Sequence, residues 1–240
     1  MYKRQLYDSH KTHKAKLVPF SGFWMPLQYS SIVKEHHHVR QKCGIFDVSH
    51  MGEFIVSGQN AEKFLQMVTT NDVTVLKPGK VQYSAFCNDL GGIIDDLLVY
   101  HLGDYYMLVV NASNILKDWE WIQKHNTSFG AKLEDRSAET ALLAIQGPKA
   151  LEAMQKLTSS RLDKLNYYEH TLGTFADCEN TLIATTGYTG SGGIEIYFPS
   201  KKAPLVWEAV LEAGEAYGIA PIGLAARDTL RTEMGYCLYG

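Results

Sequence analysis

The sequence has no long uninterrupted run of apolar residues. No segment approaches the roughly 18–20 consecutive apolar residues that a membrane-spanning helix needs. The first residues, from Met1 to Leu6, show neither an apolar signal core nor a presequence rich in arginine and serine. These absences predict a protein without a membrane partner, and the cytoplasm is the expected compartment.

Cysteine is also scarce, and the positive and negative charges nearly balance. The four cysteines, at positions 43, 87, 178 and 237, form no Cys-x-x-Cys pair, which disfavours both a disulfide framework and a zinc site. The formal net charge is -3 and no polybasic block occurs, so no nucleic-acid partner is predicted. The remaining composition, 45% hydrophobic and 20% charged, is that of a globular protein. A chain of 240 residues can form one large domain or two small ones.

The nine histidines do not form a metal-binding pattern. His36, His37 and His38 are consecutive on a predicted helix and therefore point in three directions, whereas metal ligands on a helix need i, i+3 or i, i+4 spacing. His10 and His13 have better spacing, but Asp8 is the single acidic residue near them. No metal site is predicted.

The predicted elements occur in the same order twice. The first series is a strand at 53–57, a helix at 61–68, strands at 82–87, 93–102 and 105–110, and a helix at 113–125. The second is a strand at 141–145, a helix at 148–157, strands at 167–175, 182–186 and 194–198, and a helix at 203–217. This order predicts an α+β fold of two ferredoxin-like units packed together. The approximate units are residues 1–52 plus 138–240, and residues 53–137.

Two consecutive acids lie within the predicted strand at 93–102. Because side chains alternate along a strand, Asp95 and Asp96 point to opposite faces, and both faces carry apolar residues. A carboxyl group placed among apolar residues has a raised pKa unless a partner compensates, and such groups cluster at functional sites. The alternative is a strand-end aspartate that accepts a hydrogen bond from neighbouring backbone. The pattern alone does not choose between Asp95 and Asp96.

Two further segments could bind a ligand. The glycine-rich turn at 187–193 precedes a strand in which Glu195 points away from an apolar face, although a hairpin with an exposed glutamate explains the same pattern. On a predicted helix at 225–233, Arg227 follows two small alanines and can bind a carboxylate with two nitrogens, although an exposed ion pair is the more common case. Fourteen tyrosines supply flat apolar faces that suit either a planar ligand or a sheet surface.

These segments together resemble the aminomethyltransferase family. The matching motifs, in family order, lie at 20–29, 44–52, 91–97, 143–148, 187–190, 193–196, 224–228 and 235–240. Each motif by itself is weak, but eight in order over essentially the whole chain are specific. The resemblance implies the T-protein activity of the glycine cleavage system. An aminomethyl group on the lipoyl arm of H-protein would give its methylene to tetrahydrofolate, which yields 5,10-methylenetetrahydrofolate, ammonia and dihydrolipoyl H-protein.

The resemblance also implies the site residues. It assigns catalysis to Asp96, pterin contact to Glu195 and folate contact to Arg227. It places six further residues at or beside the folate site: Tyr83, Met51, Asn111, Tyr168, Tyr188 and Tyr236. Tetrahydrofolate is then a co-substrate, lipoylated H-protein is the partner, and no metal is needed.

The resemblance further implies a C-terminal β-barrel domain, of the order of a hundred residues, that this chain lacks. Three alternatives remain: the folate domain of a dimethylglycine- or sarcosine-oxidising enzyme, a non-enzymatic folate-binding regulator of the same fold, and an inert fragment. The oxidising enzymes carry a flavin domain upstream, and this sequence has no dinucleotide-binding fingerprint. A pure binder would not need the carboxylate of Asp96.

Overall fold

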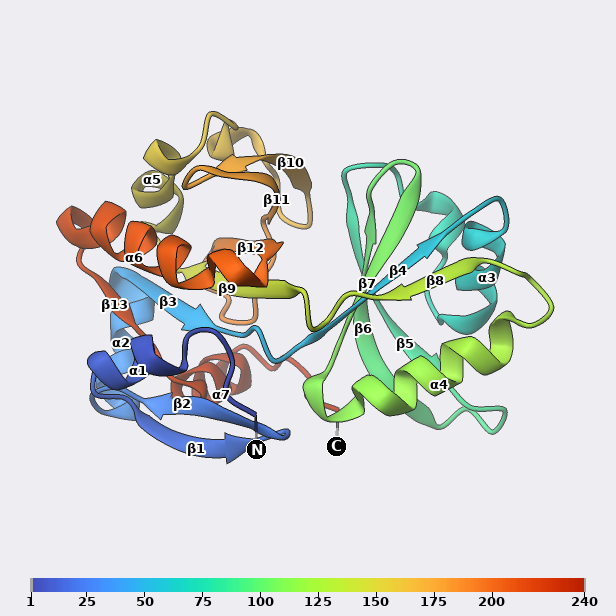
Figure 1. Ribbon diagram of the computed structural model, residues 1–240, viewed down its shortest axis with the longest axis horizontal. Helices are drawn as coiled ribbons and strands as arrows, with labels where there is room; N and C mark the ends of the chain where they lie inside the picture. Colours follow the sequence, from blue (N-terminus) through green and yellow to red (C-terminus); the bar gives the residue numbers. More distant parts are fainter. Residues whose placement is uncertain (1, 240) are drawn as a thin grey trace. The chain divides into compact units, whose positions relative to one another are not determined.

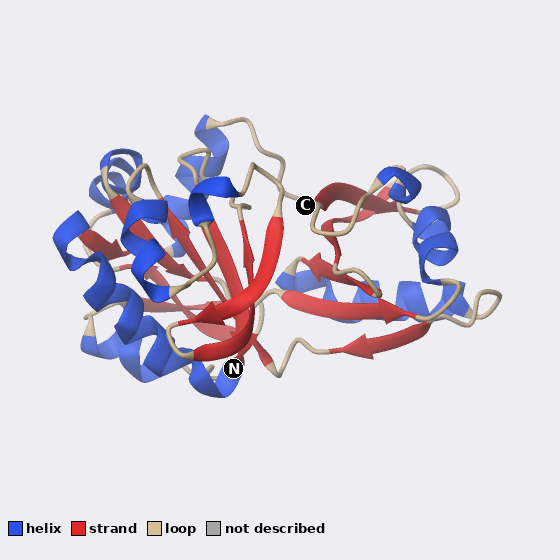
Figure 2. Ribbon diagram, turned by 90° about the horizontal axis from the view of Figure 1, so that it is seen from above, coloured by secondary structure: helices blue, strands red, loops and turns tan. Residues whose placement is uncertain are grey.

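The computed structural model describes residues 2–239 and divides them into two compact units. Unit 1 contains the residues up to His50 and Glu139–Cys237, and unit 2 contains Met51–Ala138 and residues 238–239. The strands of each unit form sheets, and helices lie against them (Figure 2). The predicted α+β class is confirmed.

Unit 2 is built on one antiparallel sheet with the strand order β5-β6-β7-β4-β8 (Figure 1). Its elements are β4 (Gly52–Ser57), α3 (Ala61–Val68), a 3-10 turn at Val73–Val75, β5 (Val81–Cys87), β6 (Ile93–His101), β7 (Tyr105–Val110), a 3-10 turn at Ala112–Asn114, α4 (Ile115–Asn126) and β8 (Lys132–Asp135). The series β4-α3-β6-β7-α4-β8 is a ferredoxin-like βαββαβ unit, and β5 is added at the edge beside β6. Phe64 and Leu65 of α3 and Ile122 of α4 pack with the apolar residues of the strands to form its core.

Unit 1 repeats this order around a six-stranded sheet, β10-β11-β12-β9-β3-β13. The repeated elements are β9 (Thr140–Gln146), α5 (Ala150–Met154), β10 (His170–Phe175), β11 (Cys178–Ala184), β12 (Gly193–Pro199), α6 (Ala203–Gly214) and β13 (Ile219–Pro221). The strand β3 (Cys43–Asp47) lies between β9 and β13 and pairs with β13 in parallel. Trp207 of α6, which has no exposed surface, is the largest side chain of the core beneath this sheet.

Four more elements complete unit 1. They are α1 (Tyr7–Thr12), the hairpin strands β1 (Lys16–Phe20) and β2 (Phe23–Gln28), α2 (Ile32–Gln41) and α7 (Leu224–Glu233). Ser31 is the N-cap of α2, and its side chain accepts a hydrogen bond from the Lys34 amide. Gly218 takes a left-handed conformation and ends the 3-10 turn that follows α6.

Several strands differ from those predicted. The hairpin β1–β2 and the strands β3, β8 and β13 were not expected, because β8 and β13 have four and three residues and β3 is buried along its whole length without alternation. The predicted strand at 167–175 begins only at His170. Tyr168 has a positive φ of 65°, which a strand residue cannot adopt.

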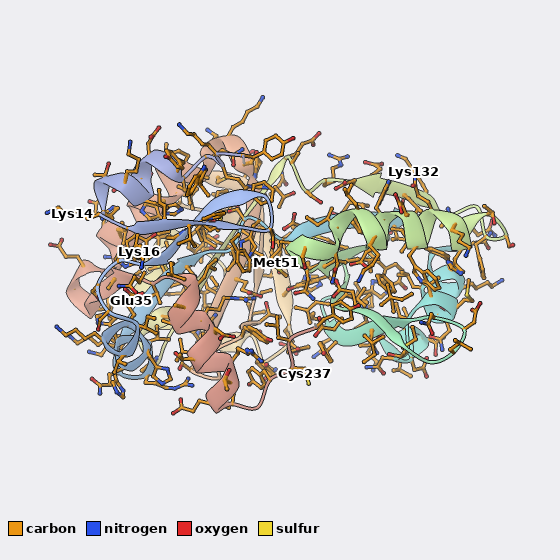
Figure 3. The ribbon with its side chains drawn as sticks, turned by 90° about the horizontal axis from the view of Figure 1, so that it is seen from below. Lys14, Lys16, Glu35, Met51, Lys132 and Cys237 are labelled. Carbon is orange, nitrogen blue, oxygen red and sulfur yellow. The ribbon has the colours of Figure 1, made fainter. Side chains whose placement is uncertain are left out.

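A buried carboxylate fixes the start of α7. Glu35 of α2, only 3% exposed, accepts hydrogen bonds from the amides of Tyr29, Ser30 and Gly223, at 2.7, 2.6 and 2.8 Å. Gly223 is the N-cap of α7, and Figure 3 labels Glu35 beside this helix. A carboxylate at a helix N-terminus interacts favourably with the helix dipole. Glu35 therefore joins α2, the end of β2 and α7.

The glycine-rich loop between β11 and β12 is held from two sides. The side-chain amide nitrogen of Gln146 donates to the carbonyls of Thr186 and Ile194. The Thr189 hydroxyl donates to the side-chain oxygen of Gln146. Arg40 of α2 donates to the Thr189 carbonyl and to the Ser191 hydroxyl on the loop. The same guanidinium donates to the Leu230 carbonyl and to Glu233 of α7. One arginine thus connects the loop to α7.

Gly193, the first residue of β12, is expected to tolerate no side chain. Its φ is 126°, and a Cβ atom would lie 2.2 Å from the Ile145 carbonyl oxygen of the paired strand. Gly193→Ala should lower the free energy of unfolding by about 2–3 kcal/mol, measured by urea denaturation. Gly192→Ala is the matched control, because Gly192 also has a positive φ, 74°, but open space around it, and should lose only about 1–2 kcal/mol. Equal losses in the two variants would contradict the close approach of β9.

Arg40→Met should separate the loop from α7 while it keeps most of the side chain's apolar volume. Since several carbonyl and carboxylate acceptors lose a charged donor, the free energy of unfolding should fall by about 1–3 kcal/mol, measured by the same denaturation. Arg161→Met removes an exposed ion pair with Asp163 and should change stability by less than about 1 kcal/mol. A loss for Arg40→Met no larger than that of Arg161→Met would show that the connection is not stabilising.

Candidate functional site

The strand β6 presents its two consecutive acids in different surroundings. Asp95 lies on the buried face with Leu97 and Val99, all at most 3% exposed. Asp96 lies on the opposite face with Leu98, where both side chains are half-buried. Both faces carry apolar residues, as the sequence indicates, but the face with Leu97 and Val99 is the one that packs into the core with α3 and α4. One acid is therefore in the core, and the other remains accessible.

The carboxylate of Asp96 is held by one hydrogen bond on each oxygen. The Tyr83 hydroxyl of β5 donates to Oδ2 at 2.7 Å, and the Asn111 side-chain amide donates to Oδ1 at 2.5 Å. Tyr83 lies on the strand paired with β6, and Asn111 follows β7 directly. Two residues assigned through the family resemblance, Tyr83 and Asn111, therefore both contact the third, Asp96. Each oxygen of Asp96 keeps a lone pair for a further donor.

The pairing of β4 with β7 places Met51 near Asn111. Gly52 of β4 pairs with Val110 of β7, so the antiparallel register places Met51 beside Asn111. Its side chain is half-buried, and Figure 3 labels it immediately before β4. Met51 thus lies at the same end of the unit 2 sheet as Asn111, but its role stays a prediction.

In unit 1, Glu195 is a half-buried carboxylate on β12. Its Oε2 accepts a hydrogen bond from the hydroxyl of Thr186, two residues after the end of β11. Burial raises the pKa of Glu195 above its usual range, and the Thr186 hydrogen bond and the positive charge of Arg227 oppose that rise. The alternative reading, an exposed hairpin glutamate, is therefore wrong. Thr186 was not identified from the sequence, where it reads only as the residue before the glycine-rich turn.

Arg227 and Tyr188 form a cation–π contact. The guanidinium carbon of Arg227 lies 4.6 Å from the centre of the Tyr188 ring, and the arginine side chain is half-buried. Burial lowers the pKa of Arg227, and the charge of Glu195 acts in the opposite direction. The exposed ion pair considered for this helix is instead made by Arg231 with Asp228. On this helix the ion pair with Asp228 is thus made by Arg231, and Arg227 contacts the Tyr188 ring.

Three more tyrosines are connected to Tyr188. The rings of Tyr188 and Tyr236 are stacked, with centroids 5.9 Å apart and an interplanar angle of 19°. The Tyr188 hydroxyl donates to the carbonyl of Cys237, which fixes the segment after α7. Tyr168 contacts the ring of Tyr167 at 4.6 Å, and Tyr167 in turn interacts with Tyr236. Contacts therefore connect Arg227, Tyr188 and Tyr236, and reach Tyr168 through Tyr167. Glu195 interacts with Arg227 through its charge.

The structure gives the histidines other partners. His36 contacts Thr229 and Glu233, and His38 contacts the carbonyl of Gly218. Within residues 2–239, no group of three or more His, Cys, Asp or Glu side chains has an arrangement that could hold a metal ion. The four cysteines are free thiols. In this same part of the chain, no helix has the length and apolar character to cross a bilayer.

Comparisons with known proteins identify the family of this chain. The model of the GCVT N-terminal domain family matches residues 6–240. The aminomethyltransferase of Flavobacterium psychrophilum is 53% identical over the whole chain, which covers 67% of that protein. That of Bacteroides thetaiotaomicron is 55% identical over 97% of the chain and is covered to 64%. The chain therefore spans about two thirds of the length of the curated relatives it matches.

Solved structures support the same relationship. The glycine cleavage system aminomethyltransferase T of Bartonella henselae superposes with a TM-score of 0.91 at 34% identity, over 99% of this chain and 63% of that chain. A chain of the heterotetrameric sarcosine oxidase of Corynebacterium sp. U-96 shares the fold alone, with a TM-score of 0.58 at 14% identity, over 80% of this chain and 95% of that chain. The chain therefore belongs to the aminomethyltransferase family, in which it corresponds to the GCVT N-terminal domain.

Proposed function

We propose that this protein serves as the tetrahydrofolate-dependent aminomethyltransferase of a glycine cleavage system. It would take the aminomethyl group carried on the lipoyl arm of H-protein and transfer its methylene to tetrahydrofolate. The products would be 5,10-methylenetetrahydrofolate, ammonia and dihydrolipoyl H-protein. The cytoplasm stays the predicted compartment.

The observation that carries the proposal is the carboxylate of Asp96, fixed by Tyr83 and Asn111 in a member of this family. The transfer needs a group that orients the folate nitrogen nucleophile, moves a proton and stabilises an iminium-like cation. A carboxylate with one donor on each oxygen is held in one orientation and still has lone pairs for a further donor. Asp96 is half-buried, so a substrate can reach it while its charge remains only partly screened.

Glu195 would supply the polar contact for the pterin, and Arg227 would supply a contact for the folate. A pterin edge presents N–H donors in a row, and a carboxylate accepts two of them together. Burial has already raised the pKa of Glu195, so a ligand that donates to its oxygens replaces solvation that the folded protein has removed. The stacked rings of Tyr188 and Tyr236 add flat apolar surface of the kind that suits a planar ligand.

Sarcosine oxidation is a weaker candidate. A chain of sarcosine oxidase shares the fold at 14% identity, whereas the aminomethyltransferases reach 53–55%. A fold supports several activities, so that likeness carries no substrate with it.

Asp96→Asn should remove most of the transferase activity. The amide keeps the size of the side chain but cannot accept a proton or balance a developing positive charge, so the rate should fall about 10²–10⁴-fold. The measurement is a single-turnover assay with aminomethyl-loaded H-protein and tetrahydrofolate, following ammonia and methylenetetrahydrofolate. It should use this chain alone and this chain extended with the C-terminal third of a relative.

Asp89→Asn is the matched control, because Asp89 lies exposed in the turn before β6 and should leave the rate unchanged. Full activity in Asp96→Asn would exclude the proposed role of this carboxylate. Folate binding without turnover in every form of the chain would instead favour a non-enzymatic folate-binding regulator. The absence of both binding and turnover would favour an inert fragment.

Glu195→Gln should weaken folate binding rather than the chemical step. The lost charge-assisted hydrogen bonds should raise the Kd for tetrahydrofolate about 10–100-fold, measured by isothermal titration calorimetry under reducing conditions. Glu212→Gln, an exposed position on α6, should leave the Kd unchanged. An unaltered Kd in Glu195→Gln would place the pterin elsewhere.

A further inference from the structure

A second acid lies in the core of unit 2, close to Asp95. Asp118, in the first turn of α4, has no exposed surface. Neither of its carboxyl oxygens has a hydrogen-bond donor among residues 2–239. An ionised carboxylate without solvent or a donor is strongly unfavourable, whereas a protonated one can donate its own hydrogen. The surroundings of Asp118 therefore favour the neutral acid.

Asp95 has the opposite surroundings. It also has no exposed surface, but three hydrogen bonds reach its oxygens. Oδ1 accepts from the side-chain amides of Asn111 and Asn114, at 2.9 and 2.8 Å, and Oδ2 accepts from the backbone amide of Asn111 at 3.2 Å. A carboxylate has about four lone-pair positions. Three amide donors stabilise the charge of Asp95 and leave room for one more donor.

The two acids interact with each other. Burial raises the pKa of Asp118 to about 9, and the hydrogen bond and negative charge of Asp95 add to this rise. Asp96 contributes in the same direction, and Lys117 acts against it. When two carboxyl groups share a buried site, one stays ionised and the other keeps its proton. The amide donors around Asp95 indicate that Asp95 is the ionised member.

We propose that Asp118 is a positioning residue for Asp96: as a neutral acid it donates a hydrogen bond to Asp95, which orients the Asn111 amide that holds the Asp96 carboxylate. The inference rests on the proposed function, in which Asp96 is catalytic. Asn111 is the connecting group, because its side-chain nitrogen lies 2.9 Å from Asp95 Oδ1 and 2.5 Å from Asp96 Oδ1. Without the donor from Asp118, Asp95 has one fewer contact that fixes its orientation, and Asn111 becomes free to turn.

The first test measures the protonation state of Asp118 and does not depend on enzymatic activity. The folded-state pKa of Asp118 lies above its ordinary value of 3.8, so the folded chain binds the extra proton between these two pH values. This stabilisation is complete below about pH 4 and is lost as the pH rises through about 9. The charged groups that act on Asp118 are Asp95 and Asp96 on β6 and Lys117 on α4.

Carbon-13 NMR of the aspartate side-chain carboxyls, assigned with Asp118→Asn, should show Asp118 still protonated at pH 7. Asp118→Asn also keeps a donor toward Asp95 and cannot ionise, so its denaturation midpoint should fall less than that of the unmodified chain between pH 7 and pH 10. Titration of Asp118 near pH 4 would overturn the proposal.

The second test measures positioning, with the single-turnover assay on the same chains. Asp118→Asn should keep the rate within about threefold, and Asp118→Leu, which has no donor, should lower it about 10–100-fold with the Kd for tetrahydrofolate unchanged. Glu120→Gln, an exposed position on the same helix, is the control and should change neither value. Equal losses in Asp118→Asn and Asp118→Leu, or no loss in Asp118→Leu, would overturn the positioning role.

The two tests fail separately. If the unmodified chain shows no transfer in any form, the proposed function fails, while the NMR titration still decides whether Asp118 donates to Asp95. If Asp118→Leu does not fold, Asp118→Asn still decides the matter, because a loss of rate in that variant contradicts the proposal by itself.

Discussion

The pleat of β6 is the constraint on which the polar structure of unit 2 depends. It sends Asp95 into the core and Asp96 to the accessible face, so two adjacent acids meet different physical demands. The buried carboxylate of Asp95 needs hydrogen-bond donors inside the protein. The amides of Asn111, after β7, and of Asn114, before α4, provide them. Because Asn111 bonds to both acids, the arrangement that satisfies the core also orients the accessible carboxylate.

Unit 1 places its charged groups by longer connections. Glu195 lies on a strand and Arg227 on a helix, and neither position follows from the other locally. Glu35 fixes the start of α7 through the Gly223 amide, and Arg40 fixes the end of the same helix to the loop that carries Tyr188. Both residues belong to α2, so one helix positions the elements that carry Arg227 and Tyr188.

The two units share a topology but not the strands that carry their acids. In unit 2 the acids lie on β6, the first strand of the central hairpin, whereas Glu195 of unit 1 lies on β12, the second strand of the equivalent hairpin. The repeated βαββαβ order therefore provides the sheet and its core in both units, and the side chains at a few positions provide the chemistry. Unit 1 also accommodates β3 between β9 and β13, which unit 2 does not repeat.

The sequence by itself determined the α+β class and the repeated order, because hydrophobic periodicity is local: the helix at 61–68 and the strand at 105–110 were predicted to the residue. It also identified Asp95 and Asp96 as a pair. Only the tertiary structure decided which acid is buried, because that depends on the face that α3 and α4 cover. The roles of Arg40 and Asp118 also came from the tertiary structure alone. Arg40 bonds to Thr189, 149 residues away along the chain, and Asp118 of α4 interacts with Asp95 of β6. Such contacts arise from packing between distant segments, which no local pattern encodes.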